Sequence, residues 1–438
     1  MNIYVVVELK KREFIPKLLL ALEAAMHNHN VYLGNINQFL KKDYLKPGLL
    51  HHKSITPVRD KISLLKRLKK KNFVISSLDE EVGGVSVNSK EYVNIRYGNK
   101  TFDLVDIIFT WGKFDYSNLI KIYKKFKKKI INSGNPRVDL WRQDFQKFYG
   151  IKQKKFILIS SNYNFLFGHV NLADKYSKKK NLDYFKRGES EKFYFNRVKK
   201  EAVLVENLVF TLKNLAKKFK SKVFLFRPHP EENVDAWKSI FDDCKNIKVS
   251  NTGNLSDIMN KAEIVLHNGC TGGLESAIRR IPTVSYMPFR DMSAGHPVAN
   301  KVSNIAKTEK QLVKMIERIT KNKKKYLPNK NAENEINNRY ENLENMPAYK
   351  KIVQTWNKFD SPLLKLNNND FLFKKFYLNK RLKKKLTLRP YKDYKFEPFS
   401  NKEVLEVKKK LVKINPKFKK VFIKIIGDDL LKVSLNKT

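Results

Sequence analysis

Short apolar runs alternate with longer amphipathic stretches along most of the chain. The run MNIYVVVEL (1–9) is typical of a buried strand, and FIPKLLLALEAAMHNHN (14–30) spaces its apolar residues three and four positions apart, as a helix does. The segments NFVISSLDEE, VDIIFTWG and KIINSGNPRVDL continue this alternation of strand and helix. Such a pattern predicts a mostly parallel sheet that is covered by helices on both faces.

The alternation pauses at Lys152–Lys155 and then resumes. The run FILISSNYNF (156–165) predicts a strand, and an amphipathic stretch over 189–220 predicts a long helix. Four more predicted strands and two predicted helices follow, namely KVFLFRPHP, IKVSN, EIVLHNG, PTVSYMP, LSDIMNKA and TGGLESAIRR. The pattern therefore predicts an α/β protein with two Rossmann-like, doubly wound domains in tandem.

A chain of 438 residues exceeds one ordinary hydrophobic core, which favours two domains. We expect the first domain over 1–150 and the second over 151–345. Beyond these domains, YKKIVQTW predicts a helix that returns toward the first domain, and 370–438 is dense in lysine with interleaved Phe, Tyr and Leu. Residues 346–438 are therefore predicted to form a returning helix and a basic C-terminal extension.

The charge balance is strongly basic, with 90 Lys and Arg against 43 Asp and Glu and a formal net charge of +47. Such an excess favours an anionic partner, although a compositional bias toward Lys and Asn explains it as well. Lysine runs at Lys383–Lys385 and Lys408–Lys410 alternate with apolar residues, a mixture that can lie on an anionic membrane surface. Nucleic acid is a weaker candidate, because no nucleic-acid-binding motif is present.

Two cysteines, Cys244 and Cys270, cannot form a disulfide framework, which favours a reducing cytoplasm. The apolar run Met1–Val7 is too short for a signal peptide, and no run reaches the roughly 18 apolar residues that a spanning helix needs. We therefore expect a cytoplasmic protein, with the basic extension allowing a peripheral position on the inner face of the membrane.

The motif FLFRPHPEEN (224–233) ends an apolar run abruptly on Arg227, Pro228, His229 and Pro230. Each proline fixes its own φ and restricts the residue before it, so the backbone around His229 is extended and stiff. This rigidity suits a side chain that must be aimed at a ligand. It equally suits an ordinary strand end with a rigid exit.

The segment EIVLHNGCTGGLESAI (263–278) carries the strongest signal for a ligand site. A predicted strand runs into a turn of small residues and then into a helix; the turn contains Asn268, Gly269, Thr271, Gly272 and Gly273. Small residues let backbone N–H groups approach a ligand, and a helix start favours phosphate. Glu275, one turn inside, can accept a hydrogen bond from a ribose hydroxyl. The alternative is that the glycines only permit a tight turn.

Together these motifs resemble the nucleotide-binding half of glycosyltransferases with the GT-B fold, in which two Rossmann-like domains face a cleft. RPHP is followed about forty residues later by HNGCTGGLESAIRRIPTVSY. The resemblance is closest to bacterial surface-carbohydrate biosynthesis proteins, relatives of sialyl- and Kdo-transferases and of CDP-glycerol glycerophosphotransferases. SGNPRVDLWR (133–142), ISSNYNF (159–165) and VELKKREFIPKLLLALEAA with VYLG resemble further segments of that family. The likeness covers residues 1–345.

The resemblance implies roles for particular residues. His229 and Pro230 match a His-Pro pair that contacts the phosphate of CMP, with Arg227 beside them. The acidic motif LDEEVGG (78–84) would supply the base that deprotonates the acceptor hydroxyl. Because Val82 interrupts the family's spacing, the choice among Asp79, Glu80 and Glu81 stays open, with Glu80 preferred.

Clustered carboxylates also raise one another's pKa, as a base near neutrality needs, although a solvated turn is the simpler explanation. Other candidate cleft residues are Ser161 and Asn162, and also Glu8 and Arg12, which can equally form an ordinary ion pair. Asn135 and Arg137 are expected to brace the hinge. His27, His29, His51 and His52 are expected on the solvated surface.

The resemblance implies an inverting glycosyltransferase of surface polysaccharide biosynthesis. Its donor would be a cytidine-nucleotide sugar, such as a CMP-activated nonulosonic acid or a Kdo-like sugar, and its acceptor a hydroxyl of a glycan or lipid-linked glycan. No cofactor is expected, and no spacing of His, Cys and Asp suggests a metal site. One alternative is a glycerophosphotransferase that uses CDP-glycerol or CDP-ribitol. Alternatives of another class are a basic nucleic-acid-binding protein and a non-catalytic sugar-binding protein.

Overall fold

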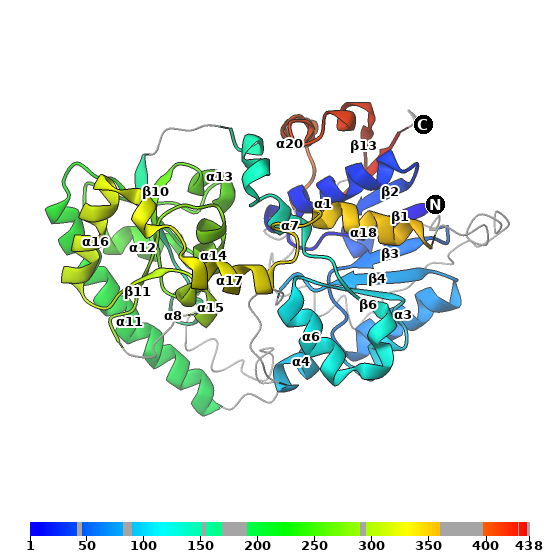
Figure 1. Cartoon of the computed structure of the whole chain (residues 1–438), viewed down its shortest axis with the longest axis horizontal. Helices are drawn as coiled ribbons and strands as arrows, with labels where there is room; N and C mark the ends of the chain where they lie inside the picture. Colours follow the sequence, from blue (N-terminus) through cyan, green and yellow to red (C-terminus); the bar gives the residue numbers. More distant parts are fainter. Residues whose placement is uncertain are drawn as a thin grey trace. The chain divides into compact units, whose positions relative to one another are not determined.

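A computed structural model describes residues 1–41, 46–81, 90–150, 155–168, 191–289, 295–359, 397–427 and 429–435. The chain divides into two compact units, of which unit 1 comprises residues 1–150 and 337–438 and unit 2 comprises 151–336 (Figure 1). Val82, the two glycines of the LDEEVGG motif and Lys383–Lys385 lie outside the described residues.

Unit 1 contains an eight-stranded sheet with the order β13-β14-β2-β1-β3-β4-β5-β6. The six strands from the first part of the chain run parallel: β1 (Asn2–Val6), β2 (Asn30–Gly34), β3 (Leu49–His52), β4 (Val74–Leu78), β5 (Ile107–Thr110) and β6 (Ile130–Asn132). Their apolar side chains are buried on both faces of the sheet, as the continuous apolar runs predict. The order is doubly wound, because β2 and β3 lie on opposite sides of β1.

The helices of unit 1 cover this sheet. They are α1 (Lys10–Met26), α2 (Ile36–Lys41), α3 (Arg59–Lys70), α4 (Lys90–Arg96), α5 (Asn99–Phe102), α6 (Lys113–Ile122), α7 (Pro136–Asp139), α18 (Ala348–Asn357) and α20 (Asn401–Val412), with the 3-10 helices η1 (Lys124–Lys129), η2 (Gln143–Phe148) and η6 (Pro416–Lys420). Helix α1 is apolar on most of its surface, and Leu18, Leu19 and Leu22 are fully buried in it. Such a helix is stable only when other elements cover it.

Helix α18 returns to unit 1 and packs against α1 and α7. Its start is held by Asp139, whose carboxylate accepts hydrogen bonds from the N–H groups of Ala348 (2.8 Å) and Tyr349 (2.9 Å). A buried pair next to this contact, Asn135 with Asn342, joins the same two segments through both side-chain and backbone atoms. The returning helix is therefore anchored by specific polar contacts.

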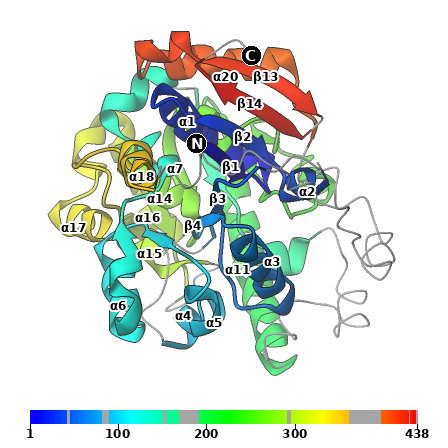
Figure 2. The same cartoon turned by 90° about the vertical axis from the view of Figure 1, so that its right-hand side faces the viewer.

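The last described residues extend the sheet of unit 1. Strands β13 (Phe422–Gly427) and β14 (Leu430–Ser434) form an antiparallel hairpin beside β2 (Figure 2). Strand β14 pairs with β2, and Leu431 lies opposite Leu33 in their register. Helix α20 buries Val404, Val407 and Leu411. Within 397–427 and 429–435, the part of the predicted basic extension that the structure describes, apolar residues thus complete the core of unit 1 while most lysines are exposed or half-buried.

Unit 2 contains a six-stranded parallel sheet with the order β12-β11-β10-β7-β8-β9. Its strands are β7 (Phe156–Ser160), β8 (Phe224–Arg227), β9 (Ile247–Val249), β10 (Ala262–His267), β11 (Thr283–Tyr286) and β12 (Asn304–Ala306). Its helices are α8 (Asn164–Phe167), α11 (Glu191–Lys218), α12 (Val234–Ile240), α13 (Leu255–Met259), α14 (Thr271–Ile278), α15 (Pro297–Lys301), α16 (Glu309–Lys321) and η4 (Lys323–Tyr326). Helix α17 (Lys330–Arg339) begins in this unit and ends in unit 1. The unit ends at Ile336, whereas the sequence pattern placed this boundary at 345.

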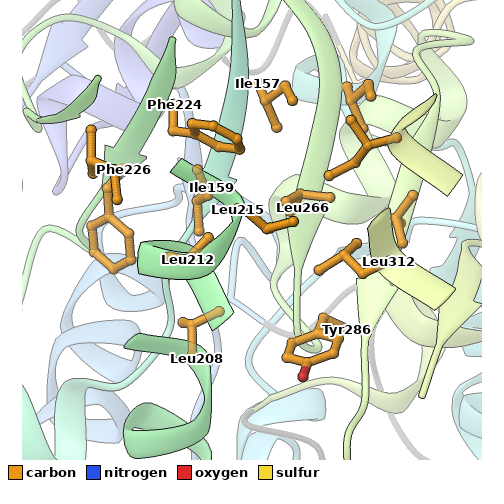
Figure 3. Close-up of a cluster of buried hydrophobic side chains, with 14 of the residues drawn as sticks. Ile157, Ile159, Leu208, Leu212, Leu215, Phe224, Phe226, Leu266, Tyr286 and Leu312 are labelled. Atoms are coloured by element: carbon orange, nitrogen blue, oxygen red, sulfur yellow. The ribbon is translucent and has the colours of Figure 1, made fainter. Parts of the chain in front are cut away.

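The core of unit 2 lies between this sheet and its long helix. Ile157 and Ile159 from β7 and Phe224 and Phe226 from β8 meet Leu208, Leu212 and Leu215 of α11 (Figure 3). In the order of this sheet, β7 lies between β8 on one side and β10 on the other. The predicted fold class, an α/β protein with two Rossmann-like sheets, is confirmed.

Candidate active site

The middle of the sheet in unit 2 is the point where the strand order reverses. The chain passes from β7 to β8 on one side and later to β10 on the other. In open parallel sheets, ligands bind at the carboxyl ends of the strands at such a point. Ser161 and Asn162 follow β7, His229 follows β8, and Asn268 to Thr271 follow β10, so the structure brings these predicted residues to one edge of the sheet.

Several contacts show that these strand ends meet. Ser160 lies opposite Arg227 in the register of β7 and β8, and the N–H of Ser161 donates to the carbonyl of Arg227 (3.1 Å). On the other side, the hydroxyl of Ser160 lies 3.1 Å from the sulfur of Cys270. A Cβ added at Gly295 would lie 2.3 Å from Nδ2 of Asn162 and 2.5 Å from the carbonyl oxygen of Gly269.

Arg227 and His229 each form hydrogen bonds with backbone groups of neighbouring loops. The guanidinium of Arg227 donates to the carbonyls of Thr252 (2.9 Å) and Gly253 (2.7 Å), and burial lowers its pKa to about 10. Nδ1 of His229 accepts from the N–H of Glu231 (3.2 Å), so a neutral ring carries its proton on Nε2. The half-buried His229 and the exposed Pro230 thus form a rigid corner with a defined donor.

The glycine-rich turn is shaped mainly by internal packing. Gly269 has a φ of 74°, and its N–H donates to Oδ1 of Asn300 (2.8 Å). A Cβ at Gly272 would lie 2.8 Å from the hydroxyl of Ser160, and one at Gly273 would lie 2.3 Å from Nε2 of His267. Gly272 and Gly273 therefore let α14 approach the sheet closely, and the expected contact of this turn with a phosphate stays a prediction.

Glu275 occupies a different environment from the one expected. It is 4% exposed, and its carboxylate accepts from Nη1 of Arg279, 3.1 Å away. This ion pair joins α14 to the residue that caps its C-terminal end, one turn further along the chain. The structure thus gives Glu275 a local partner, and its expected bond to a ribose hydroxyl stays a prediction.

A second group of predicted residues lies at the carboxyl edge of the sheet in unit 1. Glu8 follows β1, Lys53 follows β3, and Asp79 to Glu81 follow β4. The ammonium of Lys53 pairs with Glu8 and also lies 3.1 Å from Oε1 of Glu81. The strand order of this sheet reverses between β1 and β3. Lys53, which follows β3, therefore lies beside this point and joins two carboxylates at the carboxyl edge of the sheet.

The three carboxylates after β4 have different surroundings. Asp79 is 3% exposed and accepts from Nε (2.9 Å) and Nη2 (3.0 Å) of Arg96. Glu80 is 6% exposed and accepts from Nδ2 of Asn135 (3.0 Å), with the ammonium of Lys17 at 3.7 Å. The side chain of Glu81 is 39% exposed, so Glu81 is the residue of the three that reaches the surface.

The expectation that these carboxylates raise one another's pKa is wrong for Glu81. Burial acts to raise its pKa, but Lys53 and Arg96 outweigh burial and lower it to about 2. Burial raises the pKa of Asp79, and Arg96 opposes this shift. Cations lie between the carboxylates, which the sequence motif alone did not reveal.

Arg12 forms an ion pair with Glu13 at 3.3 Å, and Glu8 pairs with Lys53, so these ion pairs differ from the expected one between Glu8 and Arg12. The expectation that the histidines lie on the surface is correct for His27 but wrong for His29, His51 and His52, which are at most 3% exposed. His51 and His52 end β3, a strand that is covered on both faces. Burial lowers the pKa of His51 to about 3, so this ring is neutral near pH 7.

Sequence reasoning missed Lys53, Arg96 and Lys17 as partners of the acidic motif. In a chain with 90 basic residues, no single Lys or Arg stands out before the fold is known. It also missed Glu232, a fully buried carboxylate three residues after His229. The signal available for Glu232 was its position inside the rigid RPHPEEN motif.

Among the described residues, no group of three His, Cys, Asp or Glu side chains is placed to hold a metal ion. No helix within the described ranges is long and apolar enough to cross a bilayer.

No protein-family model matches the chain, and no curated protein matches it. Among solved structures, it is similar to UDP-GlcNAc 2-epimerase from Methanocaldococcus jannaschii, with 14% identity, 82% of this chain and 100% of that chain covered, and a TM-score of 0.49. The wall teichoic acid polymerase TagF matches with 12% identity, coverage of 82% and 88%, and a TM-score of 0.48. A glycosyltransferase from Rickettsia africae matches with 12% identity, coverage of 84% and 98%, and a TM-score of 0.44.

At 12–14% identity the likeness concerns the fold alone, and TM-scores below 0.5 give it no weight for function. The function therefore depends on the residues of the site.

Proposed function

We propose that the chain is an inverting glycosyltransferase that transfers a sugar from a cytidine-nucleotide donor, such as a CMP-activated nonulosonic acid or a Kdo-like sugar, to a glycan hydroxyl. The observation that carries this proposal is the meeting of three strand ends in unit 2. They bring Arg227, His229 and the start of α14 to the point of the sheet where nucleotides bind in doubly wound folds.

In this proposal, the donor phosphate lies against unit 2. Nε2–H of His229, the guanidinium of Arg227 and the positive end of α14 stabilise the negative charge that develops on the departing nucleotide. Charge stabilisation by protein donors makes a divalent ion unnecessary. The bond that breaks joins the anomeric carbon to the phosphate oxygen, and its electron pair stays with the nucleotide.

The acceptor side of the reaction is assigned to unit 1. The acceptor oxygen attacks the anomeric carbon while its proton passes to a carboxylate. Glu81 replaces Glu80 as the preferred base, because Glu80 is buried against Asn135 and Lys17 whereas Glu81 reaches the surface. Lys53 and Arg96 lower the pKa of Glu81 to about 2, so this role requires the acceptor to displace at least one of these cations when it binds. Glu8, which shares Lys53 with Glu81, is the second candidate.

A related alternative is transfer of glycerol phosphate or ribitol phosphate from a CDP-linked donor. It uses the same phosphate-binding residues, and the RPHP motif and glycine-rich turn favour it equally. The two alternatives differ in the bond that breaks, which is the P–O bond between the phosphates in this second case.

We also propose that unit 1 rests on an anionic membrane surface. The C-terminal elements α20, η6 and β13 carry exposed lysines beside two exposed apolar side chains, Leu405 (57% exposed) and Phe422 (40%). The exposed lysines are Lys402, Lys409, Lys413, Lys417, Lys419, Lys420 and Lys424. Basic and apolar side chains on one segment suit an anionic bilayer, where a lipid-linked acceptor would lie.

The direct test is a mass-spectrometric screen of donor hydrolysis with CMP-, CDP-, UDP- and GDP-activated compounds in excess chelator. We expect turnover of a cytidine-linked donor, with release of CMP for a sugar and of CMP plus a phosphorylated polyol for the alternative. Turnover confined to uridine or guanosine donors, or turnover that requires a metal, would contradict the proposal.

A further inference from the structure

A buried carboxylate lies under the segment that follows β7 in unit 2. Glu232 is 0% exposed and accepts three hydrogen bonds. Its Oε2 accepts from the hydroxyl of Ser161 (2.6 Å) and from Nε1–H of Trp237 (2.9 Å), and its Oε1 accepts from the N–H of Tyr163 (2.6 Å). Both oxygens are therefore used, and two of the three donors belong to the segment after β7.

A second buried carboxylate holds the next residues of that segment. Glu201 of α11 is 1% exposed, and its Oε2 accepts from the N–H groups of Phe165 (3.0 Å) and Leu166 (2.9 Å). Glu201 and Glu232 together bind donors spread over residues 161–166. This segment starts at the strand end that faces both the RPHP corner and the glycine-rich turn.

Glu232 is also tied to the RPHP corner itself. It lies three residues after His229, and its N–H donates to the carbonyl of His229 (2.8 Å). Its side chain then reaches across to Ser161 and Tyr163. One residue thus connects the corner that carries His229 with the segment that carries Ser161 and Asn162.

We infer that Glu232 is a positioning residue, which fixes the segment Ser161–Tyr163 relative to His229 and so sets the geometry of the donor site. This inference rests on the proposed function for its effect on turnover. Burial raises the pKa of Glu232 to about 7, while the three donors oppose that shift. A carboxylate in this environment keeps its place only while all its donors are present.

The variant Glu232→Gln tests the inference, because it keeps the size of the side chain and removes one acceptor. If the amide nitrogen takes the place of Oε1, it faces the N–H of Tyr163. If it takes the place of Oε2, it faces Nε1–H of Trp237, whereas the hydroxyl of Ser161 can turn and accept. In both orientations the amide N–H of the introduced glutamine points at another N–H donor, so the segment Ser161–Tyr163 must move away from it.

The double variant Glu232→Gln with Trp237→Phe provides the rescue. Removing the indole N–H lets the amide nitrogen face Ser161 while its oxygen accepts from Tyr163. The matched control is Glu231→Gln, since Glu231 is the neighbouring acidic residue and makes an exposed contact with Asn164. If Glu232 only stabilised the fold, Trp237→Phe would destabilise the variant further, because this change removes packing at a fully buried residue. Recovery in the double variant therefore indicates the hydrogen bonds of Glu232.

Two measurements are made on the full chain: amide hydrogen exchange of residues 161–166, and kcat and KM for a cytidine donor. We expect Glu232→Gln to speed exchange of these amides and to lower kcat/KM by about tenfold or more. Glu231→Gln should match the wild type, and the double variant should recover a large part of both losses. The exchange readout is independent of catalysis, so it still decides the inference if the wild type turns over no cytidine donor.

Unchanged exchange in folded Glu232→Gln protein would overturn the inference, as would a double variant that is no better than the single one. If Glu232→Gln does not fold, Ser161→Ala replaces it, because that change removes one donor without leaving an opposed pair. Faster exchange of the Tyr163 amide in Ser161→Ala protein supports the inference, and unchanged exchange contradicts it.

Discussion

His229 is held by its own chain, since Nδ1 accepts from Glu231 and the carbonyl accepts from Glu232. We expect His229→Ala to lower turnover by about 10²-fold or more, in the range seen when one transition-state donor is lost. Thermal unfolding should not change. His27→Ala is the matched control, because His27 is an exposed histidine of unit 1. Near-normal turnover by folded His229→Ala protein would remove His229 from the donor site.

The three carboxylates after β4 should respond differently to amide substitution. Glu81→Gln should keep donor binding and abolish transfer, because it removes the proton acceptor and leaves unit 2 unchanged. Asp79→Asn should instead lower the melting temperature, since it breaks the buried bidentate bond to Arg96. Donor affinity, transfer rate and melting temperature are measured for each. Transfer by Glu81→Gln protein at the wild-type rate would move the base to Glu8.

At the scale of residues, the sequence located the acidic motif, the RPHP corner and the glycine-rich turn, because prolines, glycines and clustered acids are rare and local signals. It could not reveal the partners of those residues. Arg96 lies 17 positions from Asp79 and Lys53 lies 28 from Glu81. Pairing of β3 with β4 brings Lys53 to Glu81, and helix α4 brings Arg96 to Asp79. The pKa of Glu81 depends on those partners, and the local motif pointed in the opposite direction.

The contact between α7 and the start of α18 makes a prediction about the element that returns to unit 1. Asp139→Ala leaves the N–H groups of Ala348 and Tyr349 without their buried acceptor, which should cost about 1–3 kcal/mol in the free energy of unfolding. Asp144→Ala is the matched control, because Asp144 is exposed and pairs only with Arg142 among the contacts described. Equal stability of the two variants in chemical denaturation would contradict the capping role.

The same carboxylate gives a prediction about pH. Burial raises the pKa of Asp139 from its ordinary value of 3.8 to about 7. The folded form therefore binds a proton more tightly than the unfolded form, so this group's contribution to stability falls as pH rises from about 4 to about 7. The stability advantage of the wild type over Asp139→Asn should shrink across that window. An advantage that grows with pH would show that the carboxylate is the favoured form.

At the scale of elements, apolar runs predicted most strands of the two sheets, because buried parallel strands are continuously apolar. Two short strands were missed, β3 with its two histidines and the three-residue β12. The hairpin β13–β14 was missed because FIKIIG and LLKVS lie within a stretch whose lysine density dominates its composition.

The hairpin also gives a prediction about stability. Leu431→Ala should lower the free energy of unfolding by about 2–5 kcal/mol, since Leu431 is fully buried opposite Leu33. Leu405→Ala, on an exposed side chain, should cost little.

At the scale of the whole molecule, the charge of +47 is a property of both units, and the membrane proposal concerns only the lysines of the C-terminal elements. Replacing Lys417, Lys419 and Lys420 by Glu should weaken binding to anionic vesicles by roughly 1 kcal/mol or more per residue. The matched control replaces Lys323, Lys324 and Lys325, an equally exposed lysine run of η4 in unit 2. Co-sedimentation at low salt measures both, and equal binding by the two variants would contradict a specific membrane-facing segment.

The claim on which everything else depends is that unit 2 holds a cytidine nucleotide against His229. Calorimetric titration of the full chain with CMP, CDP, UDP and GDP in excess chelator tests it most directly. We predict that a cytidine nucleotide binds the wild type without metal, that Glu231→Gln leaves its affinity unchanged, and that His229→Ala weakens it. Absence of cytidine nucleotide binding, or equal affinity of the wild type and His229→Ala, would contradict the assignment.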